Sequence, residues 1–208
     1  MAAANENQWR EFWQRLGARG DALPTWRELE TTHSESGRAY HNLHHIGHCL
    51  DEFARVCQLA DDPVAVEAAI WFHDVIYDTH RKDNEERSAE FASTALAKAG
   101  KPDTFCTSVH TLILATKHNS LPTSNDASLL TDIDLSILGQ NPERYTEFEQ
   151  QIRREYAWVT DKDYAAGRSS VLNGFLQRER IFNTPAFAQR FEEQARINLA
   201  WAIKQLAT

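Results

Sequence analysis

Cysteine is scarce in this chain, with three residues among 208, and none forms the close pairs typical of zinc-thiolate sites. An odd, scattered set also argues against a disulfide framework, so we interpret Cys49, Cys57 and Cys106 as small buried hydrophobes in a reducing compartment. No apolar run approaches the ~18 residues of a membrane span. The N-terminus lacks the basic and then apolar pattern of a secretory signal. We therefore expect a soluble, cytoplasmic protein with no membrane partner.

Basic residues are also in deficit, since 22 Lys and Arg stand against 30 Asp and Glu and give a net charge of -8. Nucleic acids are held by Lys and Arg surfaces through counterion release, so we expect no nucleic-acid partner. A small anionic substrate is compatible with this charge if local cations and a metal ion offset the overall field. With only eight Gly and six Pro, the composition is that of an ordinary globular protein.

Strand patterns are missing too, because no stretch alternates apolar and polar residues between turn signals. Proline is instead placed as at the first position of helices, where its missing N–H is not needed. The sequence predicts an all-α, single-domain helical bundle, with residues 1–38 as outer helices packed on a core domain of residues 39–208. The prolines that open predicted helices are Pro24, Pro63, Pro102, Pro142 and Pro185, and the clearest apolar stripe is Phe187, Phe191, Ala195, Leu199 and Ile203.

The adjacent pair His73 and Asp74 lies inside the apolar stretch 68–76. An imidazole and a carboxylate are costly to desolvate there unless a cation compensates them, which favours a metal ion. Adjacent residues on a helix diverge by about 100°, so both can bind one ion only near a helix end or if the Asp reaches sideways. The alternative is a buried His hydrogen-bonded to its neighbour.

Two other segments offer matching ligands. Upstream, four of the nine histidines fall within eight residues, and His41, His45 and His48 share one face if that segment is helical. Downstream, Asp132 and Asp134 lie among apolar neighbours. The order along the chain is therefore His, then His-Asp, then Asp.

That order resembles the signature of the HD superfamily of metal-dependent phosphohydrolases. Residues 40–42 (Tyr-His-Asn) followed by His45 resemble the first metal motif of cyclic-nucleotide phosphodiesterases, distant members with the same helical core. Residues 72–75 (Phe-His-Asp-Val) are similar to their second motif, and residues 134–136 (Asp-Leu-Ser) to their last. The rest looks like a subfamily described as predicted HD phosphohydrolases, from about residue 40 to the end, including residues 83–89 (Asp-Asn-Glu-Glu-Arg-Ser-Ala) and 115–118 (Ala-Thr-Lys-His).

The resemblance implies a role for each matching residue. His41 is the expected catalytic acid, and Asp74 also commonly bridges to a second ion in this family. Asp134 is preferred to Asp132 because it precedes Leu-Ser as the family's ligand does, which leaves Asp132 as an N-terminal helix residue or an orienting residue. The expected metal ligands are His45, His73, Asp74 and Asp134.

Two imidazoles and two carboxylates form a donor set that suits Mn, Fe, Co, Ni or Zn, whereas Mg prefers more oxygen; we expect one or two ions per chain. A bound ion would activate water to attack phosphorus, and His41 would protonate the leaving oxygen.

Developing phosphoryl charge needs cations, for which Lys117 is preferred and Arg168 is second. Asp78 is a candidate for activating or positioning water, and His118 for a second metal ion or the substrate. The alternative for both cations is an ordinary surface charge, and for Asp78 a carboxylate at a helix end.

The sequence thus predicts a metal-dependent phosphohydrolase acting on a phosphate ester or a nucleotide. Two alternatives stay open: an HD-fold di-iron oxygenase, and a non-catalytic module that binds a nucleotide. The substrate and the oligomeric state are left open by the sequence.

Overall fold

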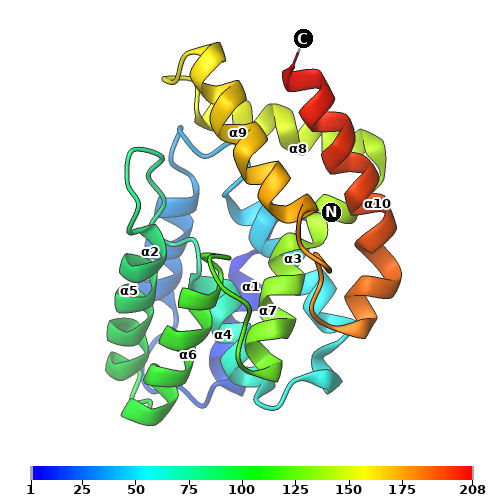
Figure 1. The fold of residues 1–208 in the computed structure, drawn as a ribbon. Coiled ribbons are helices and arrows are strands. Elements are labelled where there is room, and N and C mark those ends of the chain that lie inside the picture. Colours follow the sequence, from blue (N-terminus) through cyan, green and yellow to red (C-terminus); the bar gives the residue numbers. More distant parts are fainter. Residues whose placement is uncertain (1, 208) are drawn as a thin grey trace. The chain divides into compact units, whose positions relative to one another are not determined.

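The computed structural model describes residues 2–207. Within them it contains ten α-helices, two short 3₁₀ helices and no strand, which confirms the predicted all-α class (Figure 1). The helices form two compact units, one up to Thr131 and the other from Asp132. The predicted boundary between residues 38 and 39 falls inside the first unit.

The first unit contains seven helices and the start of an eighth. Helix α7 contains the boundary between the units, four residues before its C-terminal end. The elements are α1 (Glu6–Arg15), α2 (Leu23–His33), α3 (Leu43–Ala54), η1 (Cys57–Leu59), α4 (Pro63–Phe72), α5 (Asn84–Lys98), α6 (Asp103–Ala115) and α7 (Asn125–Leu135).

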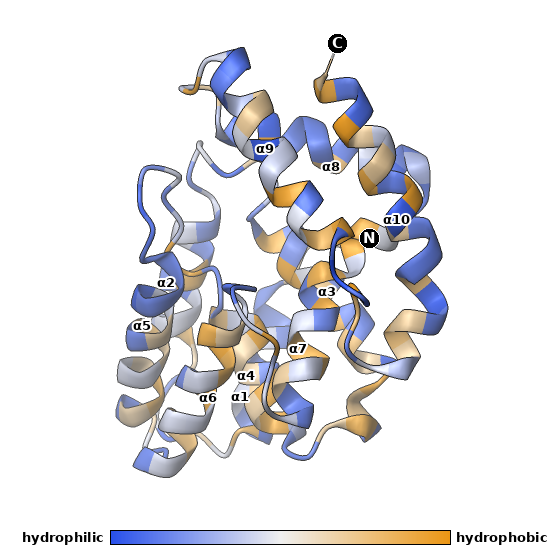
Figure 2. Cartoon of the chain, in the orientation of Figure 1, coloured by the Kyte–Doolittle hydropathy of each residue, from blue (hydrophilic) through white to orange (hydrophobic). Residues whose placement is uncertain are grey.

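Helix α4 is the core of this unit. Its sequence is apolar on nearly every side, which is the pattern of a helix buried all round rather than on one face (Figure 2). It contacts α3, α5 and α6. Asp62 fixes its start, because the carboxylate accepts hydrogen bonds from the backbone N–H groups of Val64 and Ala65, and Pro63 occupies the first turn. The helix ends at Phe72, directly before the His73-Asp74 pair.

Helix α1 packs on α4 through aromatic rings. The Trp9 ring lies 5.3 Å from that of Trp71 and 5.7 Å from that of Phe72, both edge to face. Trp9 and Phe12 are fully buried, so they belong to the packing face of this helix. This cluster fixes the C-terminal end of α4, where the candidate ligands lie.

The second unit contains η2 (Ser136–Gly139), α8 (Pro142–Glu155), α9 (Asp161–Leu176) and α10 (Pro185–Leu206). Helix α10 contacts the other three. Four residues of its predicted apolar stripe are buried, while Ile203 is half-exposed and its neighbour Ala202 is buried instead. Asn198 donates hydrogen bonds to the carbonyls of Leu138 and Gln140 at 2.8 Å and joins α10 to η2.

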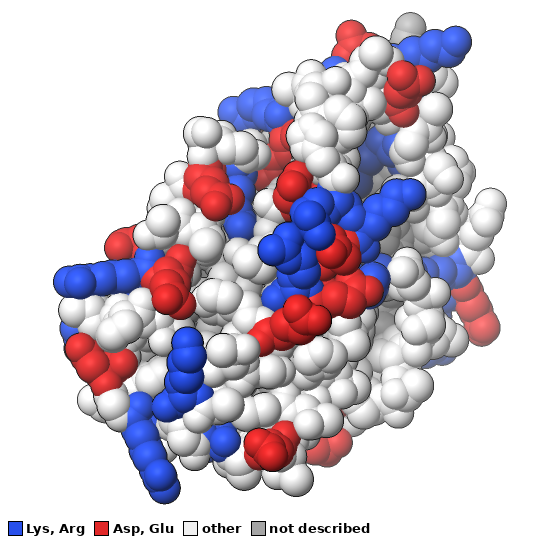
Figure 3. Space-filling model, turned by 90° about the vertical axis from the view of Figure 1, so that its left-hand side faces the viewer, with Lys and Arg blue, Asp and Glu red and all other residues white. Residues whose placement is uncertain are grey.

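Proline marks helix starts as predicted: Pro63, Pro142 and Pro185 are first residues of helices, Pro24 is a second residue and Pro102 directly precedes α6. Within the described residues, no helix combines the length and the hydrophobicity needed to cross a bilayer. Figure 3 views the side on which α2 and α5 lie in Figure 1, and acidic and basic side chains are mixed across that face.

Candidate metal centre

Helix α3 supplies the first group of candidate ligands. It begins at Leu43 because Asn42 caps it: the side-chain oxygen accepts the N–H of His44 at 2.9 Å, and the side-chain N–H₂ donates to the carbonyl of Ala39 at 3.1 Å. From this start His45 and His48 fall on the buried side of the helix, whereas His44 is exposed.

The second group follows the end of α4. Arg38 is buried, and its guanidinium donates to the carbonyls of Asp74 at 2.5 Å and Val75 at 2.9 Å. A longer hydrogen bond of 3.3 Å reaches the carbonyl of His41. The carbonyls of Asp74 and Val75 belong to the turn that follows α4, so Arg38 pairs them and holds that turn in place. The His-Asp pair therefore lies at a helix end, the condition under which adjacent residues were expected to serve one ion.

Three ligand atoms converge within the first unit. His45 Nε2 lies 3.0 Å from His73 Nε2, and His73 Nε2 lies 3.0 Å from Asp74 Oδ2. The remaining separation, from His45 Nε2 to Asp74 Oδ2, is 3.4 Å. Two nitrogens bound at 2.0–2.1 Å to one ion would be about 3.3 Å apart at a tetrahedral angle and about 2.9 Å at a right angle. The observed spacing fits a shared ion.

Hydrogen bonding orients the His73 ring for this role. Its Nδ1 lies 2.9 Å from the carbonyl of Ile70, which can only accept, so Nδ1 carries the proton. Nε2 then faces the carboxylate of Asp74, either with the lone pair of a neutral ring, which can bind an ion, or with the N–H of a protonated ring, which donates a hydrogen bond to that carboxylate. Two acceptors 3.0 Å apart repel each other unless a proton or a metal ion lies between them. A backbone carbonyl behind the ligand nitrogen is the usual support of a metal-binding His.

The Asp74 carboxyl lies beside the two imidazole rings, within 3.4 Å of both His45 Nε2 and His73 Nε2. Burial raises its pKa, but His73 and the hydrogen bonds from His45 and His73 outweigh burial and hold that pKa well below its ordinary value. Asp74 is therefore ionised at neutral pH, as a metal ligand must be.

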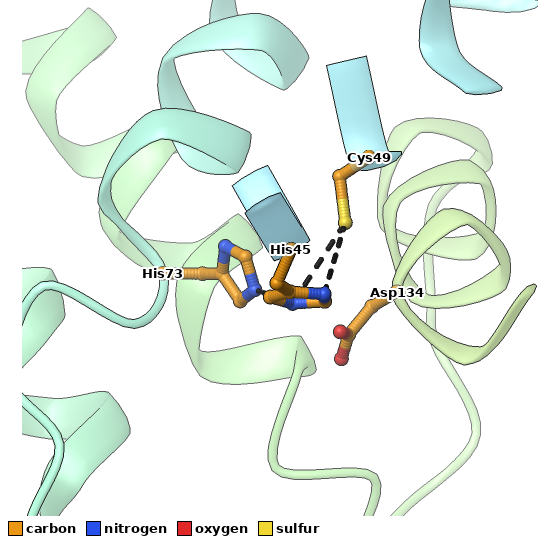
Figure 4. A group of neighbouring side chains, drawn as sticks. All are labelled: His45, Cys49, His73 and Asp134. Atoms are coloured by element: carbon orange, nitrogen blue, oxygen red, sulfur yellow. Dashed lines mark hydrogen bonds between the residues drawn. The ribbon is translucent and has the colours of Figure 1, made fainter. Parts of the chain in front are cut away.

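Cys49 joins this group, although the sequence analysis interpreted it only as a small buried hydrophobe. It follows His45 by one helical turn on α3, and ligand atoms of Cys49, His45 and His73 all lie within 4.8 Å of one another (Figure 4). Figure 4 also draws Asp134, which belongs to the second unit. The spacing of four residues between His45 and Cys49, on a predicted helix, was the signal that could have identified this thiol.

Asp132 and Asp134 lie on the last turn of α7, in the part of this helix that belongs to the second unit. Asp132 is fully buried, and its carboxylate accepts hydrogen bonds from the backbone and side chains of Asn183 and Thr184 at 2.7–3.0 Å. Burial raises the pKa of Asp132, although these hydrogen bonds act in the opposite direction. Because α7 begins at Asn125, Asp132 is not an N-terminal helix residue, which rules out the first of the two expectations for it. Asp132 instead fixes the residues that precede α10. Asp134 stays the preferred metal ligand of the two, and its assignment as a ligand stays a prediction.

His41 lies beside the converging ligands. Its ring stacks on that of Tyr77 at 4.0 Å, and its centroid lies 5.9 Å from that of His45. His48 is buried on α3.

The remaining predicted residues have structural partners. Asp78 is exposed and accepts the N–H of His80 at 2.9 Å, which is the main cause of its lowered pKa. Lys117 forms an ion pair with Glu86, and His118 adopts a positive φ of 55° just after α6. Arg168, in the second unit, forms a two-pronged ion pair with Glu149 at 3.0 and 2.6 Å. Their assignments to substrate, water or a second metal stay predictions.

The chain matches no protein-family model, and comparisons with curated proteins and with solved structures gave no significant match.

Proposed function

We propose that the protein is a metal-dependent phosphohydrolase of the HD type, built on a helical bundle of that kind and acting on a small phosphate ester or nucleotide in the cytoplasm. The observation that carries the proposal is the convergence of His45 Nε2, His73 Nε2 and Asp74 Oδ2 within 3.4 Å, in the first unit. These residues match the motifs that resemble the HD superfamily.

The donor chemistry fits a divalent ion. The Ile70 carbonyl holds the His73 ring with Nε2 toward Asp74, and Arg38 holds Asp74 in place through a hydrogen bond to its backbone carbonyl. Asp134 is the proposed further ligand, on the motif resemblance. When bound, the ion supplies a nucleophile by activating water at neutral pH.

Proton transfer is assigned to His41. Its ring is held by stacking on Tyr77, close to His45, so it can protonate the oxygen that leaves phosphorus. Lys117 is the proposed cation for the developing phosphoryl charge, with Glu86 orienting it.

The test is hydrolysis by protein purified without chelator, measured as phosphate release from a panel of nucleotides, phosphomonoesters and phosphodiesters with Mn²⁺, Co²⁺, Ni²⁺, Zn²⁺ or Mg²⁺. We expect turnover with at least one ion, and its loss in His73→Gln. His110→Gln is the control, because His110 lies on α6 and belongs to none of the matched motifs. Turnover in His73→Gln equal to wild type would refute the proposal, as would the absence of hydrolysis with every ion.

A further inference from the structure

We infer that the thiolate of Cys49 is a ligand of the same metal ion, and that the resident ion is therefore a thiophilic one such as Zn²⁺, Co²⁺ or Fe²⁺ rather than Mg²⁺. The inference rests on the proposed metal centre and adds a sulfur donor to it. Neither the motif pattern nor the resemblance assigns any role to this residue.

Position on the helix makes Cys49 a natural second ligand from α3. Residues four apart lie one above the other on the same helix face, so the thiol and the His45 ring project in the same direction from one rigid element. In Figure 4 the Cys49 sulfur points toward the His45 ring, and the His45 ring lies next to that of His73.

The distance from Cys49 Sγ to His45 Nε2 is close to that expected for two ligands of one ion. Cys49 Sγ lies 3.8 Å from both Nδ1 and Nε2 of His45, so it is aligned with neither nitrogen. Sulfur at 2.3 Å and nitrogen at 2.0–2.1 Å from one tetrahedral ion would be about 3.6 Å apart. Because Sγ lies as close to Nδ1 as to Nε2, the two side chains must rotate so that Sγ moves toward the Nε2 side of the ring before both donors can share one coordination sphere.

The other two cysteines lie in different surroundings and serve as controls. Cys106 Sγ faces the carbonyl of Lys101 at 3.9 Å, and burial raises its pKa, so it stays a neutral thiol. Cys57 Sγ faces the carbonyl of Ala54 at 3.8 Å on a partly exposed turn. Cys49 alone among the three contacts imidazole nitrogens, which are metal ligands themselves.

Sulfur ligation changes which metal the centre prefers. A thiolate is a soft donor that favours Zn²⁺ and its neighbours, whereas Mg²⁺ and Mn²⁺ favour oxygen. As the sulfur–metal bond forms, the S–H bond breaks and its proton passes to solvent, so binding releases a proton and strengthens with pH.

The experiment adds Co²⁺ alone to metal-free full-length protein and records the near-ultraviolet spectrum. In wild type we expect a sulfur-to-cobalt charge-transfer band whose absorbance rises as Co²⁺ binds and stops rising when the site is full. The band should persist in Cys57→Ser and Cys106→Ser and disappear in Cys49→Ser, which still binds Co²⁺ through His45, His73 and Asp74. If Cys49→Ser does not fold, a band that persists in Cys57→Ser and in Cys106→Ser still assigns the sulfur ligand to Cys49, and a band lost in either variant overturns the inference.

Metal affinity gives a second readout. Loss of a supporting residue alone commonly weakens metal binding 10–100-fold, so Cys49→Ser should weaken Zn²⁺ binding by at least about 10-fold and leave Mg²⁺ binding unchanged. X-ray absorption of the zinc-loaded protein should show a sulfur neighbour at about 2.3 Å.

Bound Co²⁺ without a charge-transfer band in wild type would overturn the inference, as would a band that survives in Cys49→Ser. If hydrolysis persists in that case, the proposed function stands and only the sulfur ligand is wrong. Failure of wild type to bind Co²⁺ or Zn²⁺ at all would overturn both.

Discussion

Replacement of Arg38 by Met should be among the most damaging single substitutions in the first unit. Arg38 is 7% exposed, and its guanidinium donates at 2.5 and 2.9 Å to the carbonyls of Asp74 and Val75. A hydrogen bond from a charged group contributes about 1.5–3 kcal/mol, so losing these two should lower the free energy of unfolding by about 3–6 kcal/mol. Met retains much of the apolar stem, so the loss is mainly that of the hydrogen bonds.

The assay is urea unfolding of metal-free protein followed by tryptophan fluorescence. Trp9, Trp13, Trp26 and Trp71 are buried in the first unit, while Trp158 and Trp201 are exposed, so the signal reports mainly on that unit. Arg10→Met is the matched control, because Arg10 forms an exposed pair with Glu6 that contributes about 0.3–0.5 kcal/mol. If the two variants unfold at the same urea concentration, Arg38 does not hold the turn after α4 as described.

Three further predictions concern other parts of the chain. Burial lowers the pKa of His33 from 6.5 to about 4, so between these pH values the unfolded state binds more protons than the folded state. The protein should therefore lose about 3 kcal/mol of stability as pH falls through that window. His33→Gln should flatten this pH dependence of stability, and an unchanged pH profile in the variant would contradict the prediction. Trp71→Ala removes the ring on which α1 packs and should lower the free energy of unfolding by about 3–5 kcal/mol in the same urea assay. A smaller loss of stability than in Arg10→Met would show that the aromatic cluster does not stabilise the first unit. Glu149→Ala should destabilise the second unit by about 3–5 kcal/mol, because it removes the ion-pair partner of Arg168. The double variant Glu149→Gln with Arg168→Met should be less destabilised in thermal unfolding, because neither charge remains. A smaller loss of stability in Glu149→Ala than in the double variant would refute this prediction.

Helix positions were predictable because the local signals are strong. Pro63 with Asp62 before it defines the start of α4, and the four-residue apolar repeat from Phe187 defines the buried face of α10. These signals act over neighbouring residues and can be read from a sequence. The division of the helices into two units depends on packing between distant segments, and it was not predicted.

The metal centre was predictable in part for the same reason. His45, His73 and Asp74 were identified from motifs, and the structure brings these three together. Arg38 was missed because its partners are backbone carbonyls, which carry no residue-type signal. Cys49 was missed because a lone cysteine on the buried face of an amphipathic helix has the same pattern as a core residue. Only the neighbouring imidazole distinguishes it, through the spacing from His45.

The most direct test of the central claim is elemental analysis of His45→Ala and His44→Ala, both purified without chelator beside the wild type. The two residues are adjacent on α3, but His45 faces the cluster and His44 is exposed. We predict stoichiometric divalent metal in wild type and His44→Ala and a loss of nearly all of it in His45→Ala, with far-ultraviolet circular dichroism showing that all three are equally helical. Equal metal in folded His45→Ala and wild type would contradict the account.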